Sequence, residues 1–271
     1  MTIVITGAGG VLCGAFARAL AEDGHKVALL DLNLEAAEAI AAEIREKGGE
    51  AIAVKANVLD KDNLAEAHET VLKTFGKCEV LINGAGGNNP KGTTTSEYFN
   101  KADLLDENAR SFFDLDKDGV SFVFNLNFLG TLLPTQAFAQ DMLETGGCIV
   151  NISSMNAYTP LTKIPAYSGA KAAVTNFTQW LAVHFANCNI RVNAIAPGFF
   201  ATNQNRALLF NEDGTPTART HKILSQTPMG RFGEPEELLG TLRFLIDNDA
   251  AGFITGITVP VDGGFSAYSG V

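Results

Sequence analysis

Short apolar runs alternate with longer amphipathic stretches along most of the chain. Seven apolar runs have the length and bounding residues of buried strands: Thr2–Thr6, Lys26–Leu30, Ala51–Ala56, Glu79–Ile82, Cys148–Ile152, Ile190–Ala196 and Ile257–Val261. The intervening stretches predict helices over Ala15–Asp23, Leu34–Lys47, Lys61–Phe75, Val120–Glu144, Ala170–Phe177 and Pro235–Asp247. Strands that alternate with helices favour a parallel sheet covered on both faces. We therefore predict an α/β fold, a single doubly wound Rossmann-type domain over residues 1–271 with a seven-stranded parallel sheet.

Two polar segments interrupt this alternation, one near residues 88–119 and one near residues 199–230. The first contains several charges together with Phe99, Phe112 and Phe113. Long irregular segments at the ligand-binding end of a sheet are often functional loops, and the second could act as a lid. We expect both to be substrate loops, although the first could also be a solvated excursion.

A glycine-rich turn, Gly7–Gly14, joins the first predicted strand to the first predicted helix. Such a turn lets a nucleotide pyrophosphate approach the backbone at a helix N-terminus. Asp31 closes the second strand, where a dinucleotide site has its ribose-binding carboxylate. That carboxylate would repel a 2′-phosphate, so the predicted cofactor is NAD (NADH) rather than NADP. The turn residues expected at the cofactor are Gly7, Gly10, Val11 and Leu12.

Three polar residues fall at the carboxyl ends of predicted strands: Asn57, Asn83 and Ser154. Ligands bind at that edge of a parallel sheet. We therefore expect these side chains to lie near the cofactor.

Tyr167 and Lys171 are four positions apart on the helix that follows Ser154, so they share one helix face. An ammonium about 4 Å from a phenol, at an effective dielectric constant of about 20, favours the phenolate by about 4 kcal/mol, or roughly 3 pKa units. Tyr167 would then titrate near neutrality, where a general acid or base works best. The Ser154 hydroxyl could hydrogen-bond the reacting substrate oxygen. Taken alone, the pair could equally be an ordinary Tyr and Lys on a helix.

Composition narrows the class of protein. The chain has 271 residues, 46% hydrophobic and 18% charged, which indicates a well-buried globular core. The formal net charge of −10 argues against nucleic-acid and membrane partners. The four cysteines are scattered without a Cys-x-x-Cys pair, and we expect free thiols in a reducing cytoplasm. The four histidines show no metal-binding spacing, so no metal is expected.

In order and spacing, these motifs resemble the classical short-chain dehydrogenases/reductases over essentially the whole chain. The glycine motif of that family matches Thr6-Gly7 and the turn after them, and its strand-four motif matches Asn83-Gly84-Ala85-Gly86. The resemblance implies a catalytic tetrad of Asn127, Ser154, Tyr167 and Lys171. In the family's scheme Asn127 holds a water that connects the lysine to solvent. The cofactor contacts implied are those of Asn57, Val58, Asn83, Ala85, Tyr167, Lys171, Pro197 and Thr202.

The sequence departs from the family pattern at three places. Val11 and Cys13 replace the last two glycines of the turn. Asn57 stands where Asp is commoner, although its amide oxygen can still accept a hydrogen bond from an adenine amino group. Gly84 stands where a second Asn is common.

Within the family, the sequence is most similar to the D-mannonate oxidoreductases (fructuronate reductases) of the short-chain type. This resemblance rests on Gly9–Leu12, Asn125–Gln136, Ser154–Lys163 and Asn205–Phe210. It implies a sugar-acid substrate, oxidised at a secondary alcohol or reduced at the ketone. A buried carboxylate needs a cation and amide partners. The candidate substrate-binding residues are Ser154, Asn156, Lys163, Arg206 and Asn88, although Lys163 and Arg206 could also be ordinary surface charges.

Other activities stay open at this point. The same scaffold serves gluconate 5-dehydrogenase-like enzymes and other polyol or keto-sugar reductases. A non-catalytic NAD-binding protein is a second alternative, against which the complete tetrad argues. A carrier-bound acyl substrate would need a basic docking patch, of which the acidic composition gives no sign. The family also implies a homotetramer, in which Phe177, Trp180 and Phe185 would lie either on the interface or in the core.

Overall fold

The computed structural model describes residues 1–201 and 209–270, and within these ranges seven parallel strands form one sheet. Their order across the sheet is β3-β2-β1-β4-β5-β6-β7. The strands are β1 (Thr2–Thr6), β2 (Lys26–Asp31), β3 (Glu50–Lys55), β4 (Val80–Asn83), β5 (Gly147–Ile152), β6 (Ile190–Pro197) and β7 (Thr258–Val261). The predicted seven-stranded, doubly wound sheet is confirmed.

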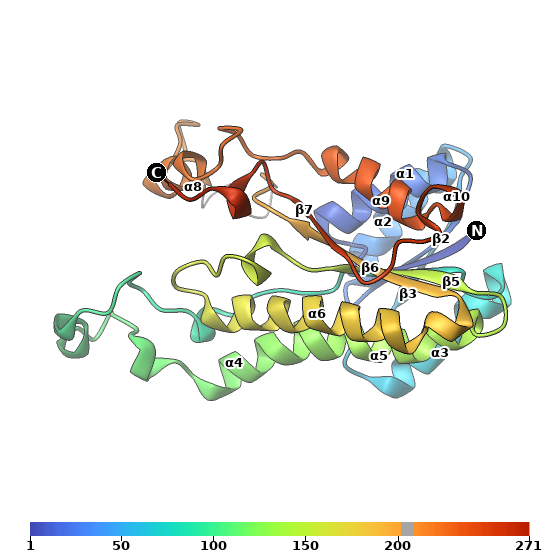
Figure 1. The fold of residues 1–271 in the computed structure, drawn as a ribbon, viewed down its shortest axis with the longest axis horizontal. Helices are drawn as coiled ribbons and strands as arrows, with labels where there is room; N and C mark the ends of the chain where they lie inside the picture. The colour runs from blue at the N-terminus through green and yellow to red at the C-terminus, as the bar shows by residue number, and fades with distance from the viewer. Residues whose placement is uncertain (202–208, 271) are drawn as a thin grey trace.

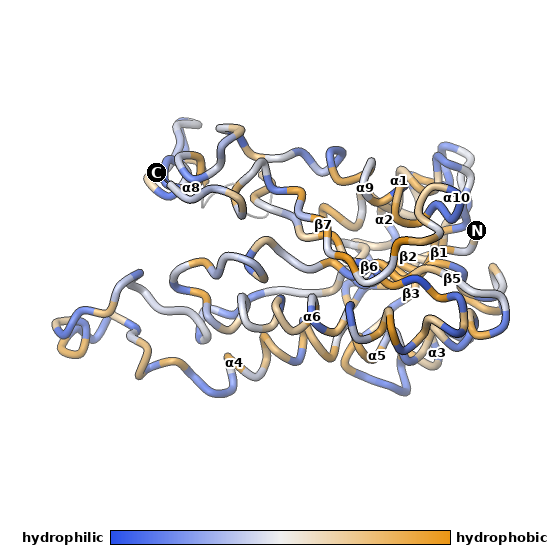
Figure 2. Tube along the Cα trace, in the orientation of Figure 1, coloured by the Kyte–Doolittle hydropathy of each residue, from blue (hydrophilic) through white to orange (hydrophobic). Residues whose placement is uncertain are grey.

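Helices cover both faces of the sheet (Figure 1). One face packs against α1 (Val11–Glu22), α2 (Leu34–Glu46) and α9 (Leu239–Ile246). The other packs against α3 (Lys61–Phe75), α5 (Gly130–Phe138) and α6 (Pro165–His184). The shorter helices are α4 (Lys117–Phe124), α8 (Ala218–Ser225) and α10 (Asn248–Ala251). Figure 2 shows hydrophobic residues gathered in the strands between these two layers.

The two cores explain why the middle of β1 is apolar at successive positions. Ile3 and Ile5 pack into the same core as Phe16, whereas Val4 between them packs into the other core with Phe138. Side chains alternate between the two faces of a strand, and here both faces are covered. Burying one such side chain contributes roughly 1.5–3 kcal/mol, so a polar residue at any of these positions would be costly.

The predicted helix Val120–Glu144 is wrong as a single element. A π-helical turn, Asn125–Leu129, separates α4 from α5, and a 3-10 turn, Ala139–Met142, follows. The Asn127 Nδ2 donates to the carbonyl of Val123 at 2.7 Å, and the N–H of Gly130 bonds to the carbonyl of Asn125. The Asn127 side chain therefore competes with backbone N–H groups for a carbonyl of the helix. The helix widens there into a π-helical turn. Such turns concentrate at functional sites.

Three predicted helix starts are also too late. Helix α6 begins at Pro165 rather than Ala170, with Pro165 at its first position, and it runs to His184 rather than Phe177. Helix α1 begins at Val11 rather than Ala15, because Gly10 is the extended N-cap residue and Gly14 already bonds back to it. Helix α4 begins at Lys117, inside the segment predicted to be irregular, where the Asp116 carboxylate accepts from the N–H of Gly119 at 2.7 Å. Such an N-cap typically contributes about 1 kcal/mol.

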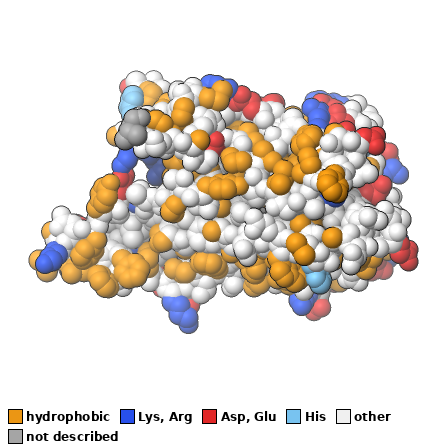
Figure 3. Space-filling view, in the orientation of Figure 1, with side chains coloured by type: hydrophobic (Ala, Val, Ile, Leu, Met, Phe, Trp, Pro, Cys, Tyr) orange, Lys and Arg blue, Asp and Glu red, His pale blue; other side chains and the backbone are white. Residues whose placement is uncertain are grey.

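The first interrupting segment and the described parts of the second, residues 199–201 and 209–230, lie at the carboxyl edge of the sheet, on the left of Figure 1. The segment before α4 projects from the body and contains only short 3-10 turns: Pro90–Gly92, Lys101–Leu105 and Phe112–Asp114. Its exposed apolar side chains are those of Tyr98, Phe99, Leu104, Leu105, Phe112 and Phe113. Figure 3 shows hydrophobic side chains gathered at the lower left, where this segment lies in Figure 1. Across the described residues, no helix has the length and apolar character needed to cross a membrane.

Candidate active site

Helix α6 places Lys171 beneath Tyr167, as the four-residue spacing predicts. The Lys171 Nζ lies 5.7 Å from the centroid of the Tyr167 ring and donates to the carbonyl of Ile152 at 2.8 Å. That carbonyl is at the carboxyl end of β5. Ser154 follows two residues later, and its hydroxyl interacts with the Tyr167 phenol. Ser154, Tyr167 and Lys171 are therefore brought together at one edge of the sheet.

The electrostatic balance differs from the one expected from the sequence. Burial raises the pKa of the Tyr167 phenol above its ordinary value, and the hydrogen bond with the Ser154 hydroxyl acts in the opposite direction. Burial also lowers the pKa of Lys171 to about 8, with a small opposing effect from Cys13. The prediction that Lys171 brings the pKa of Tyr167 to neutrality is wrong for this structure. The reason is that the same burial penalises both the phenolate and the ammonium that was expected to stabilise it.

Asn127 is fully buried in the π-helical turn and joins the site through the segment after β4. Its Nδ2 donates to the carbonyl of Gly87 at 2.7 Å, and its Oδ1 accepts from the N–H of Gly87 at 3.3 Å. Gly86 lies between Asn127 and Lys171. A Cβ at Gly86 would be 2.6 Å from the Asn127 Oδ1 and 3.1 Å from the Lys171 Nζ. Only glycine lets the backbone pass here, so the π-helical turn and the lysine face each other closely.

A cavity with an empty volume of about 1210 Å³ opens over the glycine-rich turn. Gly7 has a positive φ of 68°, and a Cβ there would lie 2.9 Å from the backbone of Ala85. The turn therefore stays flat against the segment after β4. The N–H groups of Ala8, Gly9 and Gly10 already donate within the protein, so the first N–H groups of α1, which begins at Val11, are the ones left for a ligand. The predicted cofactor residues that line this cavity are Gly7, Gly10, Val11, Leu12, Asp31, Asn57, Val58 and Ala85.

Asp31 closes the floor of this cavity. Its Oδ2 accepts from the N–H of Gly9 at 2.9 Å, and its Oδ1 accepts from the N–H of Asn33 at 2.8 Å. The carboxylate thus fixes the glycine-rich turn while keeping lone pairs for ribose hydroxyls. Its negative charge at this point is unfavourable for a 2′-phosphate.

Other predicted cofactor residues lie outside the cavity lining. The Asn83 side chain is buried and donates to Asn151 at 2.9 Å and Thr135 at 3.0 Å, so it braces the sheet. Pro197 is buried at the end of β6. Thr202 lies outside the described residues. The Asn57 Oδ1 already accepts from the N–H of Leu59 at 3.1 Å, which leaves it one lone pair for an adenine amino group.

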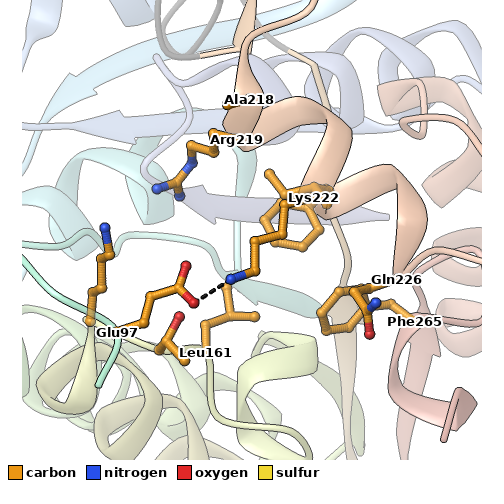
Figure 4. Close-up of a pocket in the computed structure, with 11 residues that line it drawn as sticks. Glu97, Leu161, Ala218, Arg219, Lys222, Gln226 and Phe265 are labelled. Carbon is orange, nitrogen blue, oxygen red and sulfur yellow. Dashed lines mark hydrogen bonds and ion pairs between the residues drawn. The ribbon is translucent and has the colours of Figure 1, made fainter. Parts of the chain in front are cut away.

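A second cavity, with an empty volume of about 960 Å³, adjoins the same edge of the sheet. Its lining comes from the segments that follow β5, β6 and β7, together with α8 and the projecting segment. The residues that line it include Glu97, Lys163, Arg219, Lys222, Gln226 and Phe265 (Figure 4). Part of its lining, Leu161, Thr162 and Lys163, belongs to the same segment after β5 that contains Ser154.

The predicted substrate residues are only partly brought together. Lys163 lines the second cavity, and Asn156 is buried beside Ser154 with an Oδ1 that has no hydrogen-bond partner among the described residues. Asn88 is exposed, donates to Thr93 at 3.3 Å and is not among the lining residues of either cavity. Arg206 lies outside the described residues.

Three further polar residues of the second cavity were not predicted from the sequence: Arg219, Lys222 and Gln226. They are three and four positions apart and therefore share one helix face. That spacing is the sequence pattern from which a shared polar helix face could have been predicted.

Within the described residues, no cluster of His, Cys, Asp and Glu side chains could hold a metal ion. The predicted free thiols are confirmed: Cys13, Cys78 and Cys148 are buried, and Cys188 is partly buried. Burial raises the pKa of the Cys13 thiol to about 12. Cys13 is therefore a packing residue of the cofactor cavity rather than a nucleophile.

Comparisons with known proteins agree with this geometry. Residues 9–266 match the family described as enoyl-(acyl carrier protein) reductase. An uncharacterized oxidoreductase of Haemophilus influenzae is 63% identical over 99% of this chain and 94% of its own length. The uncharacterized oxidoreductase UxuB of Bacillus subtilis is 55% identical over 100% of this chain and 96% of its own.

A solved structure is similar to this chain in fold as well as in sequence. It is a candidate D-mannonate oxidoreductase from Haemophilus influenzae with bound NAD. It is 62% identical to this chain, superposes with a TM-score of 0.96 and covers 100% of this chain and 96% of its own. At this likeness the two chains share one fold.

Proposed function

We propose a substrate and a mechanism for this chain, which belongs to the short-chain dehydrogenase/reductase family and is an oxidoreductase. The reaction proposed is the NAD-dependent interconversion of D-mannonate and D-fructuronate. The observation that carries the proposal is the cation-lined cavity at the sheet edge of Ser154 and Tyr167. Likeness to a candidate D-mannonate oxidoreductase with bound NAD supports it. We take residues 1–271 as one catalytic domain, with substrate loops near 88–119 and 199–230.

The cavity over the glycine-rich turn fits NAD. A side chain at Gly7, Gly9 or Gly10 would collide with neighbouring protein atoms, because each built Cβ lies within 3.2 Å of them, so the turn that lines the cavity needs glycine at these positions to keep its shape. Asp31 would bind the adenosine ribose, and Asn57 would face the adenine. Bound there, the nicotinamide supplies the hydride acceptor for oxidation or the hydride donor for reduction.

The chain's own side chains would handle the proton. In the oxidative direction the ionised form of Tyr167, which becomes available as the pH rises, takes the proton of the substrate hydroxyl, while Ser154 hydrogen-bonds the same oxygen. In the reductive direction Tyr167 donates the proton to the ketone oxygen. Its raised pKa keeps it protonated at neutral pH, which suits proton donation. Lys171 would hold the Tyr167 phenol and the bound cofactor in position relative to each other. Asn127 would connect Lys171 to solvent.

The substrate would be bound through its hydroxyls and its carboxylate. The unpartnered Oδ1 of Asn156 is an acceptor that a substrate hydroxyl could satisfy. Lys163 is a cation of the substrate cavity, and Arg206 and Asn88 remain candidates for further contacts.

A substrate panel tests the proposal. We expect NADH formation, followed by absorbance, with NAD and D-mannonate, and a much lower rate with NADP. D-altronate and D-gluconate are the controls, since they differ from D-mannonate only in stereochemistry. Preference for gluconate would favour the gluconate 5-dehydrogenase-like alternative. Binding of NAD without turnover of any sugar acid, polyol or keto sugar would favour a non-catalytic protein.

We further propose a homotetramer assembled through α4, α5 and α6. Trp180 on α6 is 55% exposed and stacks on His184 with ring centroids 4.5 Å apart, whereas Phe177 and Phe185 pack against the core. Trp180 is therefore the surface aromatic that a partner subunit would cover. Light scattering after size-exclusion chromatography should give four subunits for the unmodified protein and fewer for Trp180→Glu. An unchanged mass for that variant would exclude this face.

A further inference from the structure

The substrate cavity carries more positive than negative charge in a chain whose net charge is −10. Lys163, Arg219 and Lys222 line it, against the single carboxylate of Glu97 among its lining residues. Figure 4 shows the Arg219 and Lys222 side chains leaving α8 towards the space that Glu97 also enters. A local excess of cations is what an anionic ligand requires, because the protein as a whole repels it.

The positive charge of Lys222 is already balanced by a carboxylate. Its ammonium forms an ion pair with the Glu97 carboxylate and so connects α8 to the projecting segment, 125 positions away. Hydrogen bonding to Lys222, assisted by the nearby charge of Lys163, lowers the pKa of Glu97. Glu97 is therefore ionised at neutral pH, and the pair adds little net charge to the cavity.

Arg219 and Lys163 are left with unbalanced charge. Neither forms an ion pair within residues 1–201 and 209–270. The carbonyl of Lys163 accepts from the N–H of Thr94 at 2.8 Å, which fixes its backbone against the projecting segment. Lys163 also has a positive φ of 73°, a strained conformation for a residue other than glycine and one that is concentrated at functional sites.

The position of Arg219 is set by the anchoring of α8. Thr220 is fully buried, and its hydroxyl donates to the carbonyl of Leu209. Beyond the other end of the helix, the N–H of Met229 donates to the carbonyl of Gly263 at 3.1 Å. Ile223 is buried among the cavity residues. Arg219 and Ile223 are four positions apart, so the face held by Ile223 also presents Arg219 to the cavity.

We propose that Arg219 binds the substrate carboxylate, with Lys163 as the second cation, and thereby selects sugar acids over neutral sugars. A planar guanidinium can bind both oxygens of one carboxylate at once, which a lysine cannot do. The inference rests on the proposed function, because it names the residue that recognises the acid group of that substrate. The hydroxyl groups of the sugar are left to Ser154 and Asn156.

The test compares a charged substrate with its neutral counterpart. D-Mannitol carries a hydroxymethyl group where D-mannonate carries its carboxylate. We expect Arg219→Ala to raise KM for D-mannonate about 10- to 100-fold while kcat changes little, since the lost interaction is charge-assisted. KM for D-mannitol should stay unchanged. Arg219→Lys keeps the charge without the planar fork and should fall between the two.

A binding measurement accompanies the kinetics. Calorimetry of the protein with NADH and D-mannonate, which cannot react with one another, should show the same 10- to 100-fold loss of affinity in Arg219→Ala. His221→Ala is the matched control, because His221 is exposed on α8 and does not line the cavity. Far-UV circular dichroism and NAD affinity establish that each variant is folded.

The outcomes separate this inference from the proposed function. If the unmodified protein oxidises D-mannonate and Arg219→Ala binds and oxidises it equally well, the inference alone is wrong. If the unmodified protein binds D-mannonate through Arg219 but oxidises no sugar acid, the proposed function alone is wrong. If D-mannonate neither binds nor reacts, both are wrong.

Discussion

The Cys13 sulfur occupies the space that a side chain at Gly84 would need: a Cβ built on Gly84 would lie 2.1 Å from the Cys13 Sγ. Cys13 stands in the glycine-rich turn where the family usually has glycine, and Gly84 stands where it commonly has Asn. The two departures from the family pattern therefore compensate each other. A thiol on α1 fills the volume that an Asn side chain after β4 otherwise takes.

This pairing predicts a coupled effect on stability. Gly84→Asn should destabilise the protein by about 1–3 kcal/mol or more, because a side chain is forced into a filled core. In the Cys13→Gly, Gly84→Asn double variant most of that loss should be recovered. Urea unfolding measures the free energy of unfolding of each variant, and a double-mutant cycle gives the coupling, expected at about 0.5–3 kcal/mol.

Gly240 provides the matched control for that experiment. It lies within α9, and a Cβ there would meet no atom within 4 Å. Gly240→Ala should therefore stabilise the protein by about 0.5–1 kcal/mol through helix propensity. Additive effects of the Cys13 and Gly84 substitutions would contradict the compensation.

Loss of the Tyr167 hydroxyl should abolish turnover without affecting the fold. Tyr167→Phe removes the group that moves the proton, a loss of roughly 100- to 10,000-fold in kcat. NAD affinity should stay nearly unchanged, because Tyr167 does not line the cavity over the glycine-rich turn. Stopped-flow absorbance at the NADH band and fluorescence titration of the cofactor measure the two quantities.

Tyr158→Phe is the control for that variant. Like Tyr167, Tyr158 comes after β5 in the chain. Its hydroxyl donates to the carbonyl of Thr258 at 3.0 Å rather than to a catalytic group. Its removal should cost about 0.5–1.5 kcal/mol of stability and leave turnover intact. Comparable loss of turnover in both variants would show that Tyr167 has no special role in the proton transfer.

The two directions of the reaction should respond to pH with opposite signs. Burial lowers the pKa of Lys171 to about 8 and raises that of Tyr167, so the pair loses its first proton near pH 8. Oxidation needs the pair with one proton fewer, so its kcat/KM should rise with pH up to about 8 and then level off. Reduction needs the proton, so its kcat/KM should be level below about 8 and fall above it.

Lys171→Met tests the assignment of that pH dependence. Without the lysine, the proton that remains is that of the phenol, whose pKa burial raises. The midpoint should therefore move to higher pH in both directions. A midpoint that stays near 8 in Lys171→Met would assign the titration to another group. NAD affinity measured over the same pH range separates cofactor binding from proton transfer.

Much of this architecture follows from local pattern. The bounds of β1 and α3 match the predicted ones because apolar runs, and for α3 the Asp60 N-cap, mark them directly. The spacing of Tyr167 and Lys171 predicts their contact because both lie on one regular helix. The π-helical turn at Asn127 could not be predicted, since it depends on a side-chain amide competing for the carbonyl of Val123.

Long-range features were also beyond the sequence. The compensation between Cys13 and Gly84 joins residues that meet only when β1 and β4 pair. The Lys222–Glu97 ion pair, which leaves Arg219 without a carboxylate among the described cavity residues, depends on how α8 meets the projecting segment. The pKa of Tyr167 depends on total burial, to which neighbours along the helix contribute only a part.

Asp31 should decide the choice between the two nicotinamide cofactors. Its carboxylate supports the glycine-rich turn through Gly9 and also places a negative charge where a 2′-phosphate would lie. Asp31→Ala should therefore raise KM for NAD about 10-fold or more and lower KM for NADP, so that the ratio of the two kcat/KM values approaches one. Asp31→Asn removes the charge but keeps an acceptor for the Gly9 N–H, so it should relax the discrimination with a smaller loss of NAD affinity. The size of that loss measures how much of the role of Asp31 is support of the turn.

The experiment compares initial rates with both cofactors, and Asp23→Ala, at a carboxylate that pairs with Arg243 on the surface, is the control. Undiminished preference for NAD in Asp31→Ala would transfer the discrimination to other residues of the cavity.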